Sequence, residues 1–136
     1  MGRVFFNTRE NIDSDSITGT TTYVMLASDS GKTFLVSGGA QTVTLLPATE
    51  LIEGWRCKFI TTASPSGDKV IGAGSTIMHG ASANAAGTGD SSDGTAKTSV
   101  TIEAASQAGN FVEIICDGSL YHVSGTQGQN AATTFA

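Results

Sequence analysis

The chain has 136 residues, of which 14% are charged, and its formal net charge is -5. A chain of this length has room for one domain with a single core, and its low negative charge excludes the basic surface that proteins use to bind nucleic acid. Seventeen glycines, with many Thr and Ser residues, favour strands and tight turns over long helices.

Residues 1–20 are polar and turn-rich after Val4, Phe5 and Phe6, and we interpret them as an N-terminal arm. Leaving both phenylalanines in water is unfavourable, at about 25 cal/mol per Å² of apolar surface. We therefore expect the arm to dock on its own domain or on a neighbour, through Val4, Phe5, Phe6, Asn11 and Ile12. The segment has no apolar run long enough for a signal peptide or membrane span, so no membrane contact is expected.

Three short strands are predicted next. Residues 21–26 and 33–36 are separated by a turn signal that ends at Gly31. Residues 42–46 alternate threonines with Val43 and Leu45, which is the period of a half-buried strand. Pro47 ends this strand because proline has no backbone N–H.

The strongest strand signal spans residues 55–61. Trp55, Cys57 and Phe59 fall on one face of this strand, and we expect that face to point into the core. Cys116 also falls in a predicted strand. Both cysteines are interpreted as reduced, buried thiols, because cytosolic synthesis keeps thiols reduced.

Two further strands are predicted at 69–71 and 75–78, after a turn signal at 65–68. Residues 79–97 are rich in Gly, Ala, Ser and Asp and offer almost nothing to bury. They are predicted to form a long exposed loop.

The last predicted strands are 98–102, 111–116 and 120–124. Asp117-Gly118 between the last two is a signal for a two-residue hairpin loop. Residues 126–136 are too polar to form a core and are interpreted as a C-terminal arm, with Phe135 as a partner contact.

These elements predict an all-β fold, with one β-sandwich domain over residues 21–125 between two extended arms. The predicted core consists of apolar side chains from four of the strands. They are Phe34, Val43, Leu45, Trp55, Cys57, Phe59, Phe111, Ile114 and Cys116.

No pattern predicts a catalytic residue, a cofactor or a metal ion. Gly31-Lys32-Thr33 matches the end of a phosphate-binding loop, but that loop needs a glycine where this chain has Leu26. The acidic segment at 90–94 supplies too few oxygen ligands for a calcium loop. Neither His79 nor His122 has a recognisable nucleophile motif beside it, so we expect a protein that is not an enzyme.

Five segments of the chain resemble a β-rich module of tailed-phage virion proteins. The resemblance covers about residues 21–125, and the segments are YVMLASDSGKTFLV (23–36), TVTLLP (42–47), GWRCKFI (54–60), GNFVEIICDG (109–118) and LYHVSG (120–125). This module occurs in head decoration, or cement, proteins and in domains of tail and fibre proteins.

A single module with two polar arms and no coiled-coil heptads resembles a cement protein more than a fibre. The resemblance implies a jelly-roll-like sandwich that forms homotrimers on the outer capsid surface of the virion, after synthesis in the host bacterial cytoplasm. Its partner would be the major capsid protein. The alternative is a receptor- or glycan-binding module of a tail or fibre, which would use Trp55, Tyr121 and the 79–97 loop.

Overall fold

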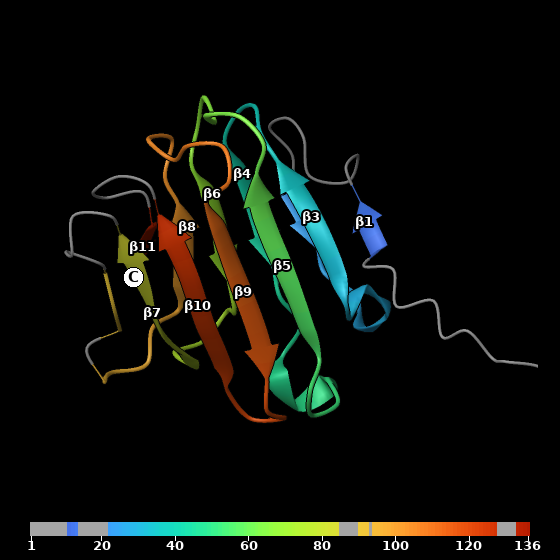
Figure 1. The fold of residues 1–136 in the computed structure, drawn as a ribbon. Coiled ribbons are helices and arrows are strands. Elements are labelled where there is room, and N and C mark those ends of the chain that lie inside the picture. Colours follow the sequence, from blue (N-terminus) through green and yellow to red (C-terminus); the bar gives the residue numbers. More distant parts are fainter. Residues whose placement is uncertain (1–10, 14–21, 85–89, 93, 128–132) are drawn as a thin grey trace, which may run out of the picture.

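The computed structural model describes residues 11–13, 22–84, 90–92, 94–127 and 133–136. These residues form two sheets that pack face to face (Figure 1). The six-stranded sheet has the order β1 (Asn11–Asp13), β3 (Lys32–Val36), β5 (Arg56–Thr61), β9 (Phe111–Cys116), β10 (Tyr121–Gln127) and β7 (Met78–Asn84). The five-stranded sheet has the order β11 (Thr133–Phe135), β8 (Ser99–Ile102), β6 (Lys69–Gly72), β4 (Gln41–Thr44) and β2 (Thr22–Val24). Two 3₁₀ turns, η1 (Ala27–Asp29) and η2 (Ala48–Glu50), lie between strands.

Successive strands alternate between the two sheets from β1 to β9. Neighbours such as β3 and β5, or β4 and β6, are therefore connected through one strand of the other sheet, which allows parallel pairing. Five of the nine pairings between described strands are parallel, including β3 with β5 and β4 with β6. The all-β sandwich prediction is confirmed, but these connections differ from the antiparallel Greek keys of a jelly roll.

The core lies between the sheets and receives side chains from both. Eight of the nine residues placed in the core from the sequence are buried: Phe34, Val43, Leu45, Trp55, Cys57, Phe59, Ile114 and Cys116. The Phe34 and Phe59 rings stack with their centroids 5.3 Å apart, and Trp55 meets the Tyr121 ring edge-on. Both cysteines are free and buried.

Phe111 is the exception, and its assignment to the core was wrong. In β9 the buried positions are Val112, Ile114 and Cys116, so the strand period turns Phe111 to the outer face. There its ring is half-buried, and Lys58 Nζ lies 4.5 Å from the ring centroid.

The predicted exposed loop at 79–97 is also wrong over much of its length. Residues 78–84 form β7, which pairs in parallel with all of β10. Of the strand predicted at residues 75–78, only Met78 belongs to a strand. The small residues of β7 permit this approach, because a Cβ at Gly80 would lie 2.1 Å from the Val123 carbonyl oxygen. Residues 90–92 lie on the other side of β7, where the Ser82 and Ser92 amides each donate a backbone hydrogen bond.

The predicted C-terminal arm is largely part of the domain. Thr126 and Gln127 extend β10, and β11 pairs with β8 at the edge of the five-stranded sheet. The Ala136 carbonyl oxygen accepts hydrogen bonds from the amides of Thr98 and Ser99. These residues form sheet contacts because their backbone groups complete the β8 edge, although their side chains gave little apolar signal. Residues 128–132 lie outside the described residues.

One end of the interior is polar. Lys69 is almost completely buried, and its Nζ donates hydrogen bonds to the carbonyl oxygens of Gly38 (2.9 Å) and Gly39. Burial lowers the pKa of this ammonium group. Gln41, beside Lys69 on β4, is also buried. Lys69 thus holds the β3–β4 loop against the start of β6.

Replacing Phe59 and Phe111 separately by Ala tests which phenylalanine supports the core. Phe59→Ala is expected to lower the free energy of unfolding by about 3–5 kcal/mol, because it leaves a buried cavity. Phe111→Ala removes a half-buried ring from the outer face and is expected to cost less than about 1.5 kcal/mol. Urea denaturation measures both values, and equal losses would contradict the inward and outward placement.

Alkaline pH is expected to destabilise the fold through Cys57. Burial raises the pKa of this thiol above its usual 9.0, with a smaller contribution from the charges of Asp29 and Glu113. Above pH 9 the unfolded chain therefore loses a proton that the folded chain keeps, so the free energy of unfolding falls by up to about 1.4 kcal/mol per pH unit.

The stability difference between wild type and Cys57→Ala isolates this effect from the other titrating groups. The difference should be constant between pH 7 and 8.5 and should shrink above pH 9. A difference that stays constant to pH 10.5 would show that the thiol does not titrate in this way.

Candidate functional site

The residues predicted to contact a partner separate into three groups. Val4, Phe5 and Phe6 lie outside the described residues. Asn11 and Ile12 belong to β1, whose backbone pairs with β3 of the same chain. Phe135 is half-buried against the core of its own domain, and its amide donates a 2.8 Å hydrogen bond to Asp90 Oδ2.

An exposed apolar surface lies at the end of the sandwich where β2 ends and β5 begins. Of the four large apolar side chains that are exposed in the described part of the chain, three belong to it: Val24 (53% exposed), Leu26 (54%) and Ile52 (78%). Trp55 connects the segments that carry Leu26 and Ile52. Its indole N–H donates a hydrogen bond to the Leu26 carbonyl oxygen, and its backbone N–H donates one to the Ile52 carbonyl oxygen. We call Val24, Leu26 and Ile52 the end patch.

A buried carboxylate holds the loop that presents Leu26. Asp29 is 1% exposed, and its Oδ2 accepts hydrogen bonds from the Leu26 amide (2.8 Å) and the Tyr23 hydroxyl (3.1 Å). Its Oδ1 forms a 2.7 Å ion pair with Lys32 Nζ. These contacts satisfy a charge that would otherwise be costly to bury, and they fix the loop from both sides.

The N-terminal segment joins the sandwich close to the same end. Asn11, the first described residue, pairs with Lys32, whose side chain binds Asp29. The described part of the predicted arm, Asn11–Asp13, therefore lies near the loop that carries Leu26.

The outer face of the five-stranded sheet continues from the end patch. The residues that pair from strand to strand on this face form two rows. Val24 belongs both to the second row and to the end patch. The rows are Thr22, Thr42, Val70, Thr101 and Thr134, and then Val24, Thr44, Gly72 and Ser99. None of these nine positions carries a charge, although the chain has a net charge of -5.

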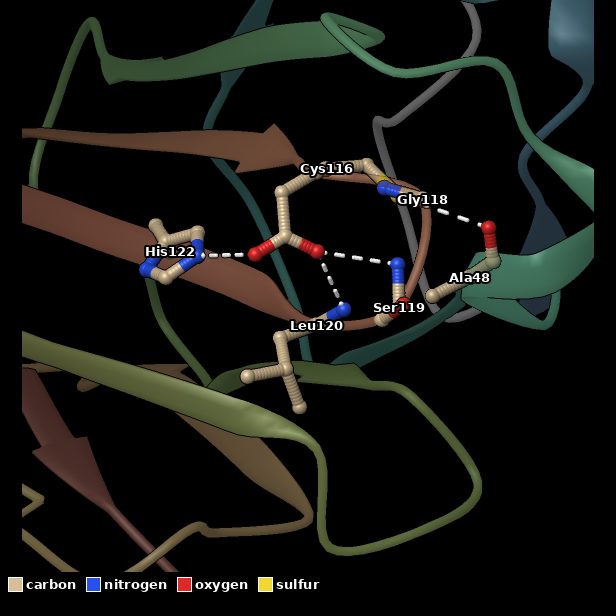
Figure 2. A network of polar contacts seen from close by, with 7 residues as sticks. Ala48, Cys116, Gly118, Ser119, Leu120 and His122 are labelled. Carbon is tan, nitrogen blue, oxygen red and sulfur yellow. Dashed lines mark hydrogen bonds and ion pairs between the residues drawn. The ribbon is translucent and has the colours of Figure 1, made fainter.

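The β9–β10 connection presents a second polar arrangement (Figure 2). Asp117 Oδ1 accepts hydrogen bonds from the amides of Ser119 (2.9 Å) and Leu120 (2.7 Å), and its Oδ2 lies 2.7 Å from His122 Nε2. The hydrogen bond from His122 and those from the two amides lower the pKa of Asp117 to about 2. The loop spans residues 117–120, so it is longer than the predicted two-residue turn.

The remaining groups that could bind or react are enclosed. Trp55 and Tyr121 are 1% and 0% exposed, so neither ring offers a face to a ligand. The raised pKa of the Cys57 thiol keeps it protonated, which makes it a poor nucleophile. Within the described residues, no three His, Cys, Asp or Glu side chains are arranged to hold a metal ion. No helix among them has the length and apolar character to cross a membrane.

Sequence reasoning did not identify the end patch. Ile52 forms a short apolar pair with Leu51 between Glu50 and Glu53, and the sequence does not say which of the two is exposed. In the structure Leu51 is buried. Asp29 falls within the turn signal that ends at Gly31, and no sequence pattern indicates its contacts with Tyr23 and Leu26, because they depend on the folded loop.

Comparison of the chain with models of protein families, with curated proteins and with solved structures finds no match. The end patch is the structural observation that bears on function.

Removing the His122 imidazole tests the electrostatics of the β9–β10 loop. In His122→Ala the pKa of Asp117 is expected to rise from about 2 toward its usual 3.8, because the largest cause of its lowering is lost. The carboxylate interaction stabilises the fold above pH 3.8, and this stabilisation is lost as the pH falls toward 2. A carboxyl-carbon NMR titration measures the pKa directly. Ser124→Ala, at an exposed neighbouring position of β10, should leave it unchanged.

Proposed function

We propose that the chain is a non-enzymatic cement protein that binds the outer capsid surface of a tailed phage and stabilises contacts between neighbouring major capsid proteins. The observation that carries the proposal is the end patch. Three large apolar side chains stand exposed, Val24 at the end of β2 and Leu26 and Ile52 on segments that are held by Trp55, with Asp29 also fixing the Leu26 loop. Exposed apolar clusters of this kind mark protein interaction sites.

The surroundings of the patch suit a protein partner. Nine paired positions without a charged side chain adjoin it on the outer face of the five-stranded sheet, with the Glu103 carboxylate only at the far edge beside Thr134. Charged residues are depleted at the centre of protein interfaces. Asn11, a member of the predicted N-terminal arm, pairs with Lys32 close to the end patch. In this proposal Val4, Phe5 and Phe6 of the same arm extend the contact. A preformed patch loses little conformational freedom on binding, which favours affinity.

The proposed mechanism is burial combined with multivalency. In a homotrimer on the capsid, three modest contacts act together, and their combined affinity exceeds that of a single contact by orders of magnitude when the geometry permits simultaneous binding. Such a protein clamps adjoining subunits without any bond-making step.

The alternative, a glycan-binding module, loses the residues on which it depended. Trp55 and Tyr121 are buried, and much of the 79–97 segment is committed to β7 and its neighbours. Sugar-stacking sites need an accessible aromatic face. The cement function is therefore the one that the geometry favours, and a glycan array is expected to give no hits.

The binding test uses expanded, undecorated capsids assembled from the major capsid protein of the same phage. Wild-type protein is expected to co-sediment with these capsids. The double variant Leu26→Asp/Ile52→Asp should bind at least about tenfold more weakly, because two apolar side chains are replaced by charges that must lose water on binding. The matched control is Ile115→Asp, which charges the fourth exposed apolar position, on the other sheet.

Three outcomes decide this test. Equal losses in the double variant and in Ile115→Asp would contradict the end patch as the contact. Unchanged binding of Phe5→Ala/Phe6→Ala would remove the arm from the proposal. A failure of wild-type protein to bind, or a handful of copies per virion in place of hundreds, would overturn the capsid function itself.

A further inference from the structure

The two histidines of the chain are neighbours in the six-stranded sheet. His79 of β7 and His122 of β10 occupy the same register position, and laterally paired residues of adjacent strands lie about 4.8 Å apart. Both side chains point to the outer face, because side chains alternate along a strand and the residues next to the histidines in sequence, Met78, Tyr121 and Val123, are buried. His122 is 53% exposed and His79 is partly exposed. Two imidazoles are thus presented together to solvent.

Asp117 fixes the chemical state of one of them. An ionised carboxylate only accepts hydrogen bonds, so His122 Nε2 must carry the proton in its 2.7 Å contact with Asp117 Oδ2. In the neutral imidazole the lone pair then lies on Nδ1. Asp117 is itself held by the amides of Ser119 and Leu120, which keeps it in place (Figure 2). A carboxylate on the far nitrogen is the usual companion of a metal-binding histidine, because it orients the ring and makes it more basic.

We propose that His79 and His122 together bind a divalent transition-metal ion of the Zn²⁺ class. Imidazole nitrogen is a preferred ligand for Zn²⁺, at about 2.0–2.1 Å, and side chains on neighbouring strands reach one ion from both sides. The described residues supply two ligands and not three, so water completes the coordination shell. Asp117 acts on the ion through His122 as a positioning residue. The site lies on the six-stranded sheet and does not depend on the end patch.

The test is a titration of the full chain with Zn²⁺ alone, followed by calorimetry and by ¹⁵N NMR of the imidazole rings. One ion is expected to bind per chain, with a shift of the His122 Nδ1 resonance while Nε2 stays protonated. His79→Gln and His122→Gln should each abolish binding in the same concentration range. Asp117→Asn keeps an oxygen acceptor for the turn amides but loses the carboxylate charge, and it is expected to weaken binding about 10–100-fold.

Matched controls separate a chelate from adventitious binding. Thr126→Ala, at another exposed outward position of β10, should bind Zn²⁺ as wild type does, and Mg²⁺ should not shift either ring because it prefers oxygen ligands. Binding that survives in both single histidine variants would overturn the proposal, since each ring would then bind alone. Absence of binding up to millimolar Zn²⁺, or one ion shared between two chains, would also overturn it.

Discussion

The strand order of this protein depends on one constraint, the alternation of successive strands between two sheets. Each crossing places the next apolar segment on the opposite side of the same core, so that Phe34 and Phe59 in one sheet face Val43 and Ile71 in the other. Neighbours such as β3 and β5, or β4 and β6, can then run parallel, because the intervening strand of the other sheet carries the chain back to the same end. The crossings leave loops at both ends of the sandwich, and the surfaces argued to have functions are built there or on the outer faces.

Polar contacts decide what these loops present. Asp29 is enclosed and holds its loop through Tyr23, Leu26 and Lys32, whereas Asp117 is exposed and holds a hairpin and one imidazole. In the first case the result is a fixed apolar surface that suits a protein partner, because a rigid contact is ordered before binding. In the second case the result is an oriented ring nitrogen that suits a metal ion. The same kind of side chain thus supports two different chemistries, according to what it holds and how far it is buried.

Much of the sheet structure could be predicted, because alternation is visible wherever large apolar residues mark every second position, as at Trp55, Cys57 and Phe59. The period gives two faces but does not say which is inside when both carry apolar residues. For this reason Phe111 was placed in the core together with Ile114 and Cys116, although it lies on the opposite face of β9 from them, and Val112 was left out of the core that it occupies. β7 gave no signal, because its pairing with β10 needs small residues such as Gly80 and not large ones. The end patch and the His79–His122 pair were not predictable, since each arises from segments that only the fold brings together.

The parallel pairing of β3 with β5 and of β4 with β6 has a consequence for the speed of folding. In such a chain most native pairings join segments that are distant along the polypeptide, so loop-closure entropy must be overcome before those contacts form. The β9–β10 hairpin is the connection that can close locally, and its four-residue loop is stabilised by Asp117. It is therefore suited to serve as an early nucleus onto which the interleaved strands assemble. A chain wound in this way matures slowly compared with a helical protein of equal length.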